Sequence, residues 1–433
     1  MFILKISKLF IFTLLITQGI LMSATLKEIK HNNTNIPVIF EKNNSLPIFN
    51  IQLIFQNSGY INDKKDIGIT NLSAKVLNEG TKKDGAINYA RELENNAISI
   101  STSTGFETFV IEISCLKSEY KIALKYLNKL LKDPNTTQTT LDKIKLLEIS
   151  KLQQKENDFD YIASKNLKKI QYKNTPLEYT SKGEIKHIKK ISLKKVQQHL
   201  EKTLNLDNLI IVVGGDIEFK NIKDNIEDTL TLIQPQGKTS FEKINVSNKI
   251  EEKIEIKDTE QSYIYFSSPF NINYNSKDSY KAKVASFILG GSGFGSRLME
   301  EIRVKNGLAY SAYGNITNNK SHTHFTGYLQ TKLSNTQKAK EMVSKIVNQF
   351  VKKGVTKNEL QAAKNFLLGS EPLRSETFAQ RLNRAFHLYY RGLPFDYPQY
   401  ELEKINNLTL NDLNSFIKEH NEIKQLSFSI VTK

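Results

Sequence analysis

The stretch LGGSGFGSRLMEEIRVKNGLAYSAYG, residues 289–314, joins a glycine-rich segment to a helix pattern and the start of a strand. Its four glycines are Gly290, Gly291, Gly293 and Gly295. A helix is expected from about Ser296 to Asn306, because Asn306-Gly307 is a strong stop signal. The run LAYSAYG then begins a strand. This order of loop, helix and strand is the most informative local pattern in the chain.

Glycines before a helix are also typical of phosphate-binding loops. Neither a Gly-Lys-Ser/Thr nor a Gly-x-Gly-x-x-Gly pattern is present, and a helix-like segment (KAKVASFIL) rather than a strand precedes the glycines. A flexible loop that admits an extended chain close to its backbone agrees better with the pattern.

Two halves of the chain repeat each other. The run ISLKKVQQHL at 191–200 matches LTLNDLNSFI at 408–417, and TLDKIKLLEISKL from Thr140 matches TKNELQAAKNFLL from Thr356. Both matches have an offset of about 217 positions (408 minus 191). A shared offset over several segments indicates a duplicated domain.

Each half predicts a strand, a helix, two strands with period-two alternation, a long amphipathic helix, further helices and a last strand. This order favours an α+β fold of two homologous α/β sandwich domains, each a mixed sheet with helices on one face. The expected domains are 25–236 and 254–433. The segment 237–253 lacks apolar periodicity and is the expected linker.

The first 24 residues, MFILKISKLFIFTLLITQGILMSA, predict an export signal. Lys5 and Lys8 precede an apolar run at 9–22, and small residues follow it at a possible cleavage site. The run is shorter than the roughly 20 residues of a membrane helix, and no later segment has the length and apolarity of a span. The chain is expected to be exported, periplasmic or secreted, with an uncleaved anchor as the alternative.

Composition excludes several classes of function. The formal net charge is +16, but the lysines are scattered and no Arg/aromatic interleaving is present, so a solvated surface is favoured over nucleic-acid binding. The single cysteine, Cys115, cannot form an internal disulfide. It lies in the alternating run FVIEISCL, which predicts a buried strand thiol rather than a nucleophile.

The run GGSGFGSRLMEEIR–GLAYSAY resembles the hallmark of the second domain of the insulinase/pitrilysin family of zinc peptidases, especially the processing-peptidase branch. The first-half pattern N-S-G…GITNLSAKVLNEGT and the duplicated halves agree with this family from about residue 30 to the C-terminus. The resemblance implies a clamshell of two domains around peptide substrates. It also implies that the glycine segment contacts the peptide.

In that family an arginine and a tyrosine of the second half hold substrate across a chamber from the zinc. The matching residues are Arg303 and Tyr310, which the resemblance therefore assigns to catalysis. A guanidinium and a phenol can donate hydrogen bonds to a peptide carbonyl and to the charge that develops on it.

The zinc motif of the family, His-x-x-Glu-His, is missing. Its positions hold Asn71, Ala74 and Lys75, so two metal ligands and the general base are absent. The family's third ligand, a glutamate on a later helix, aligns with Lys151, while Glu148 lies one turn away and could restore one carboxylate. A single carboxylate is not a zinc site.

His322 and His324 form a second candidate metal site, since on a strand both would face the same side. No third ligand is evident from the sequence. The remaining histidines are scattered and are expected to be structural or exposed.

Three hypotheses follow. The leading one is a non-zinc subunit that binds no cofactor itself and pairs with a zinc-bearing relative, supplying Arg303 and Tyr310 to the partner's zinc site. The second is a catalytically inert peptide-binding or scaffold protein of the same family. The third, an independent hydrolase with an unrecognised metal site, requires the alignment at Asn71 to mislead.

Overall fold

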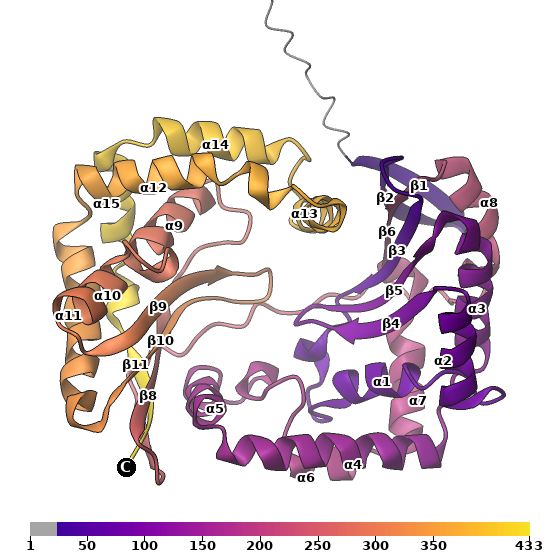
Figure 1. Cartoon of the computed structure of the whole chain (residues 1–433), viewed down its shortest axis with the longest axis horizontal. Coiled ribbons are helices and arrows are strands. Elements are labelled where there is room, and N and C mark those ends of the chain that lie inside the picture. The colour runs from indigo at the N-terminus through magenta and orange to yellow at the C-terminus, as the bar shows by residue number, and fades with distance from the viewer. Residues whose placement is uncertain (1–23) are drawn as a thin grey trace, which may run out of the picture.

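The computed structural model describes residues 24–433, which form two α/β halves whose sheets face each other across the middle of the molecule (Figure 1). The expected export signal lies outside the described residues except for Ala24.

The first half contains, within the described chain, a six-stranded mixed sheet in the order β1-β2-β6-β3-β5-β4. Its strands are β1 (Thr25–His31), β2 (Thr34–Lys42), β3 (Ile48–Gln56), β4 (Ser99–Thr104), β5 (Thr108–Leu116) and β6 (Leu209–Gly215). Strand β6, LIIVVGG, runs parallel to β2 and antiparallel to β3 and is buried along its whole length. Such a continuous apolar run is typical of a strand covered on both faces.

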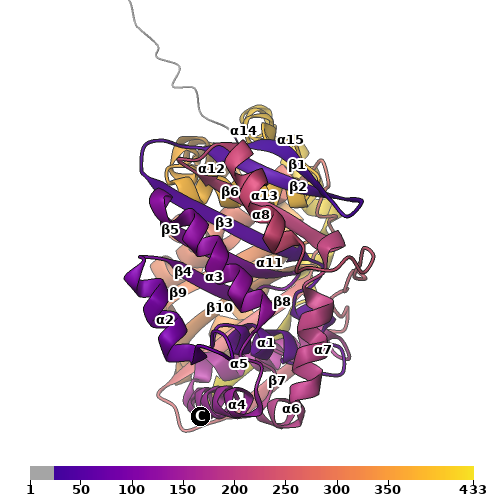
Figure 2. The same cartoon turned by 90° about the vertical axis from the view of Figure 1, so that its right-hand side faces the viewer.

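Helices cover the outer face of this sheet, and Figure 2 shows α3 and α8 in front of its strands. The helices of the first half are α1 (Ile69–Leu77), α2 (Gly85–Asn95), α3 (Tyr120–Lys132), α4 (Gln138–Gln154), α5 (Phe159–Gln171), α6 (Ile185–Lys190), α7 (Leu193–Thr203) and α8 (Phe219–Leu230). Their apolar stripes and alternate strand residues form one core, which contains the predicted buried thiol of Cys115. Burial raises the pKa of that thiol to about 12, so it is a poor nucleophile.

The second half repeats this topology. Its sheet has the order β7-β11-β8-β10-β9, formed by β7 (Glu252–Ile256), β8 (Gln261–Pro269), β9 (Ala309–Asn318), β10 (Thr323–Lys332) and β11 (Ser427–Thr432). Strand β11 is parallel to β7 and antiparallel to β8, as β6 is to β2 and β3. The predicted α+β fold of two homologous halves with mixed sheets is confirmed.

Helices again lie on the outer face, at the left of Figure 1. The helices of the second half are α9 (Ser279–Ser286), α10 (Arg297–Met299), α11 (Thr336–Lys353), α12 (Lys357–Gly369), α13 (Phe378–Tyr390), α14 (Tyr397–Asn407) and α15 (Leu410–Glu419), and α13 is the one that does not lie on this outer face. Two π-helical turns, at Phe287–Gly291 and Glu300–Lys305, continue α9 and α10.

One helix of each half crosses to the inner face of the other half's sheet. Helix α13 packs on β2, β3 and β6 through Leu382 and Phe386, and α5 packs on β8 and β11, where Ile162 contacts Val431. In Figure 1 these two helices lie between the sheets. The sequence predicted helices on one face only, because an apolar stripe does not show which sheet the helix covers.

The segment between α8 and β7 contains no helix or strand. It is nevertheless packed against the first half, since Phe241, Ile244 and Val246 join a small core with Tyr60 and Tyr172. This segment therefore helps α5 and α13 to hold the two halves together.

Candidate functional site

Helix α1, which contains Asn71, Ala74 and Lys75, is fixed in place at its N-terminus. The buried Asp63 carboxylate accepts hydrogen bonds from the backbone N–H groups of Gly68 (2.8 Å) and Thr70 (3.3 Å). The Thr70 hydroxyl also lies 3.0 Å from Nε2 of the half-buried His199 on α7. Burial raises the pKa of Asp63 to about 7, although its hydrogen bonds oppose the shift. These contacts position α1 without making it reactive.

An ion pair occupies the place where the sequence predicted a lost metal site. Lys75 Nζ on α1 lies 2.8 Å from Glu148 Oε1 on α4, and Lys151 Nζ lies 3.3 Å from the same oxygen. Glu148 is only 2% exposed, whereas Ala74 is buried and carries no polar group. Glu148, and not Lys151, is therefore the residue that pairs with Lys75.

The pKa of Glu148 reflects two opposing effects. Burial raises it, but the hydrogen bonds and charges of Lys75 and Lys151 outweigh burial, and the net shift is downward. The carboxylate is thus ionised at neutral pH and shared by two ammonium groups. Its second oxygen, Oε2, is buried and has no hydrogen-bond partner among the described residues.

The glycine-rich segment of the second half has two structural parts. Gly290 and Gly291 belong to the π-helical turn after α9, and Gly290 lies so close to β9 that a Cβ atom there would be 2.5 Å from Gly314 N. Gly293 and Gly295 form the loop proper and have φ of 68° and 88°, which favour glycine. The predicted loop is therefore shorter than the four glycines suggest.

The loop ends in a helix cap that orients Arg303. Ser296 donates a hydrogen bond to the carbonyl of Gly293 (2.7 Å) and accepts one from the N–H of Met299 (3.4 Å). The helix ends at Lys305, as the stop signal predicted. Arg303 lies in the π-helical turn Glu300–Lys305, and its guanidinium is 4.8 Å from the ring centre of Phe294 in the loop.

Arg303, Phe294 and Tyr310 are available to a ligand. Phe294 is 67% exposed and Tyr310, on the outermost described strand β9, is 73% exposed. Within residues 24–433 the side chains of Arg303 and Tyr310 make no hydrogen bond or ion pair. The sequence analysis missed Phe294, although an aromatic residue inside a glycine-rich loop is a usable signal because such a side chain is seldom buried there.

His324 lies on β10 and His322 comes just before that strand; their rings are on the same side, as predicted, and stack with centres 5.5 Å apart. Both are enclosed between the two halves, where the Tyr172 hydroxyl lies 3.0 Å from His324 Nδ1. Burial lowers the pKa of His322 to about 4 and that of His324 to about 3. The neutral pair joins the two halves, and it has no carboxylate or cysteine beside it that would complete a metal site within residues 24–433.

Comparisons with known proteins agree with this geometry. Residues 38–183 match the family described as "Insulinase (Peptidase family M16)", and residues 190–367 match "Peptidase M16 inactive domain". The chain belongs to peptidase family M16. A relative from Helicobacter pylori, named "Non-peptidase homolog YmxG", is 44% identical over 98% of both chains.

Two solved structures show the same M16 fold. A peptidase M16 inactive domain from Pseudomonas fluorescens matches with a TM-score of 0.85 and 22% identity, covering 94% of this chain and 98% of its own. A protease from Helicobacter pylori matches with a TM-score of 0.82 and 14% identity, covering 95% and 100%. At these identities the likeness establishes the fold alone.

The residues present do not fit the zinc of an active M16 peptidase. A zinc ion needs three or four histidine, cysteine or carboxylate ligands, and no group of three such residues occurs within residues 24–433. The Lys75 ammonium, 2.8 Å from Glu148 Oε1, already neutralises this carboxylate, and it would repel a divalent cation bound there. The third hypothesis, an independent zinc hydrolase, therefore has no ligand set in the described chain.

Proposed function

We propose that this chain is the non-zinc subunit of an exported, heterodimeric metalloendopeptidase. Its second half binds extended peptide beside the glycine-rich loop, and Arg303 and Tyr310 reach the zinc site of a zinc-bearing M16 partner. The guanidinium and the phenol stabilise the peptide carbonyl as negative charge develops on it. Cleavage takes place on the partner.

One observation carries this proposal. Tyr310 is exposed and the half-buried Arg303 lies over the ring of Phe294, while the equivalent of the metal site is closed by the Lys75–Glu148 pair. An exposed tyrosine on an outermost strand gives the isolated chain no packing energy. The inert scaffold, the second hypothesis, does not account for these two side chains, since packing does not explain them.

Export is part of the proposal and rests on the N-terminal sequence alone, with its positive start, apolar run and small residues. Within residues 24–433 no helix has both the length and the apolarity to cross a bilayer.

The proposal predicts the composition of the assembled enzyme. Co-expressed with a zinc-bearing M16 relative encoded in the same genome, this chain is expected to elute with it as a one-to-one complex. Elemental analysis should find about one zinc per two chains, because a site of this kind needs at least three suitable ligands. This chain purified alone should carry almost none. Two zinc ions per complex, or one on this chain after dialysis against a weak chelator, would refute the assignment.

A further inference from the structure

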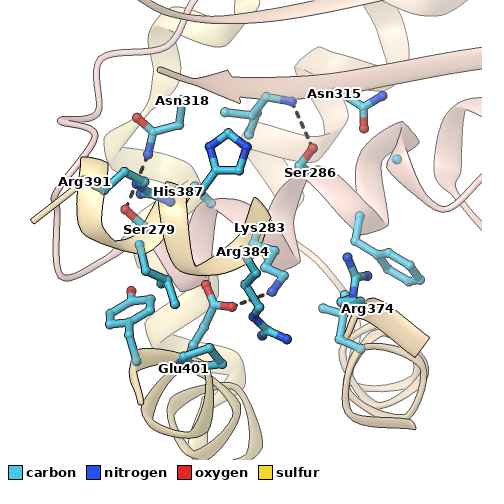
Figure 3. A pocket seen from close by; sticks show the side chains of 18 of the residues that line it. Ser279, Lys283, Ser286, Asn315, Asn318, Arg374, Arg384, His387, Arg391 and Glu401 are labelled. Atoms are coloured by element: carbon cyan, nitrogen blue, oxygen red, sulfur yellow. Dashed lines mark hydrogen bonds and ion pairs between the residues drawn. The ribbon is translucent and has the colours of Figure 1, made fainter. Parts of the chain in front are cut away.

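A cleft of about 650 Å³ lies in the second half, separate from Arg303 and Tyr310. It is bounded by α9, α13 and α14, and β9 contributes Asn315 and Asn318 (Figure 3). Gly291 of the glycine-rich segment also lines it. The volume is within the range of ligand sites in proteins, roughly 300–1,000 Å³.

Cations outnumber carboxylates around this cleft. Lys283 is paired with Glu401 at 2.5 Å, and Arg384 is paired with Glu371. Arg374 has only a loose contact with the same glutamate, at 3.8 Å.

Within residues 24–433 Arg391 pairs with no carboxylate, and it donates to the backbone carbonyl of Tyr274 (3.2 Å). His387 projects into the same space (Figure 3), and burial lowers its pKa, so it adds no charge at neutral pH. Four cations thus face two carboxylates, and Arg374 and Arg391 are the two without a close acidic partner.

The cleft also contains an unused hydrogen-bond acceptor. Asn318 donates to the Ser279 hydroxyl (3.4 Å), but its Oδ1 atom is buried without a partner among the described residues. A buried acceptor of this kind is costly unless a donor reaches it. Because the Asn318 Oδ1 atom is buried, a ligand in the cleft does not reach it, and the excess of positive charge is the feature that selects the ligand: it suits a carboxylate.

We propose that this cleft binds an acidic segment of a peptide, with its carboxylates at Arg374 and Arg391. A guanidinium binds a carboxylate through two parallel hydrogen bonds, which gives both strength and orientation. The identification of the ligand as a peptide substrate rests on the proposed function. The binding of a carboxylate to the two arginines is independent of it.

The position of the cleft limits where the acidic residue lies in the peptide. Asn315, at the cleft, is five residues from Tyr310 on the same strand. At about 3.3 Å per residue this corresponds to roughly 17 Å. A peptide extended along β9 would therefore place its acidic residue about five positions from the bond near Tyr310.

The test is a fluorescence-anisotropy titration of this chain alone, without a partner, so that failure of the heterodimer does not affect it. The probe is a labelled ten-residue peptide with two adjacent glutamates, and the comparison peptide has glutamines instead. We expect the glutamate peptide to bind about tenfold more tightly, and Arg374→Gln with Arg391→Gln to remove the difference. Arg91→Gln, which removes an exposed arginine on α2 of the first half, should have no effect.

Two further arms keep the proposal falsifiable. Glu371→Gln removes a carboxylate that competes for the arginines and should tighten binding of the glutamate peptide. This result does not depend on whether the arginine variants are stable. Inorganic phosphate should compete only at concentrations far above those of the peptide. Equal binding of the two peptides, or an unaltered affinity in the folded double variant, would overturn the anion site. Competition by phosphate as effective as that of the peptide would overturn the peptide ligand.

Discussion

Arg303→Ala is expected to lower peptide turnover by the two-chain enzyme by about 10²–10³-fold, the usual effect of removing one donor that stabilises developing oxyanion charge. Arg303 stacks on Phe294 and makes no ion pair within residues 24–433, so its loss leaves the fold of this chain intact. The complex should therefore assemble normally. The measurement is kcat/KM for an extended peptide, together with the elution volume of the complex.

Lys305→Ala is the matched control, because Lys305 is on the same helical turn, is exposed and contacts only Glu301. Tyr310→Phe should lower kcat through loss of its hydroxyl, while the ring remains. A role of Arg303 in binding alone would raise KM and leave kcat unchanged. Unchanged turnover in Arg303→Ala would remove this residue from the mechanism.

Lys75→Met is expected to reduce the free energy of unfolding by about 1–3 kcal/mol, because it leaves the buried Glu148 with one ammonium instead of two. The remaining partner, Lys151, is farther away at 3.3 Å and its side chain is more than half exposed. Denaturant unfolding of the chain alone measures this change. Lys143→Met is the control on α4, the helix of Glu148. The Lys143 side chain is 55% exposed where it pairs with Glu79, so its loss should cost less than about 1 kcal/mol.

The difference between the Lys75→Met variant and the wild type should depend on pH. The two lysines hold the pKa of Glu148 below its ordinary value of 4.5 in the folded protein, against the effect of burial. Their stabilisation is therefore fully present above pH 4.5 and is lost as pH falls through the lowered pKa. The two proteins should become more similar in stability below that pH. A constant difference from pH 7 to pH 3 would show that Lys75 acts through packing alone.

Much of the fold could be predicted from the sequence. The offset of about 217 residues between Ile191 and Leu408 indicated a duplicated domain, and the two sheets indeed have matching orders. The exchange of α5 and α13 between the halves could not be predicted. Periodicity shows that a helix has an apolar face, but Ile162 packs on Val431, far away in the sequence, and no local pattern identifies that partner.

The sequence could predict the candidate site only where its residues belong to one continuous segment. Asn71, Ala74 and Lys75 follow one another on α1, so their chemistry could be judged directly. The sequence could not decide between Glu148 and Lys151, because residues three apart are neighbours on one helical face. The basic cleft was missed for a related reason. Its arginines come from separate turns of chain, and each resembles an ordinary surface charge.

We propose that this chain binds the peptide and its partner supplies the zinc that cleaves it. The most direct test is to measure peptide turnover by each subunit alone and by the reconstituted pair. The account predicts chelator-sensitive cleavage by the pair, none by this chain, and little by the zinc-bearing partner without it. Chelator-sensitive cleavage by this chain alone, or a partner that is equally active without it, would contradict the account.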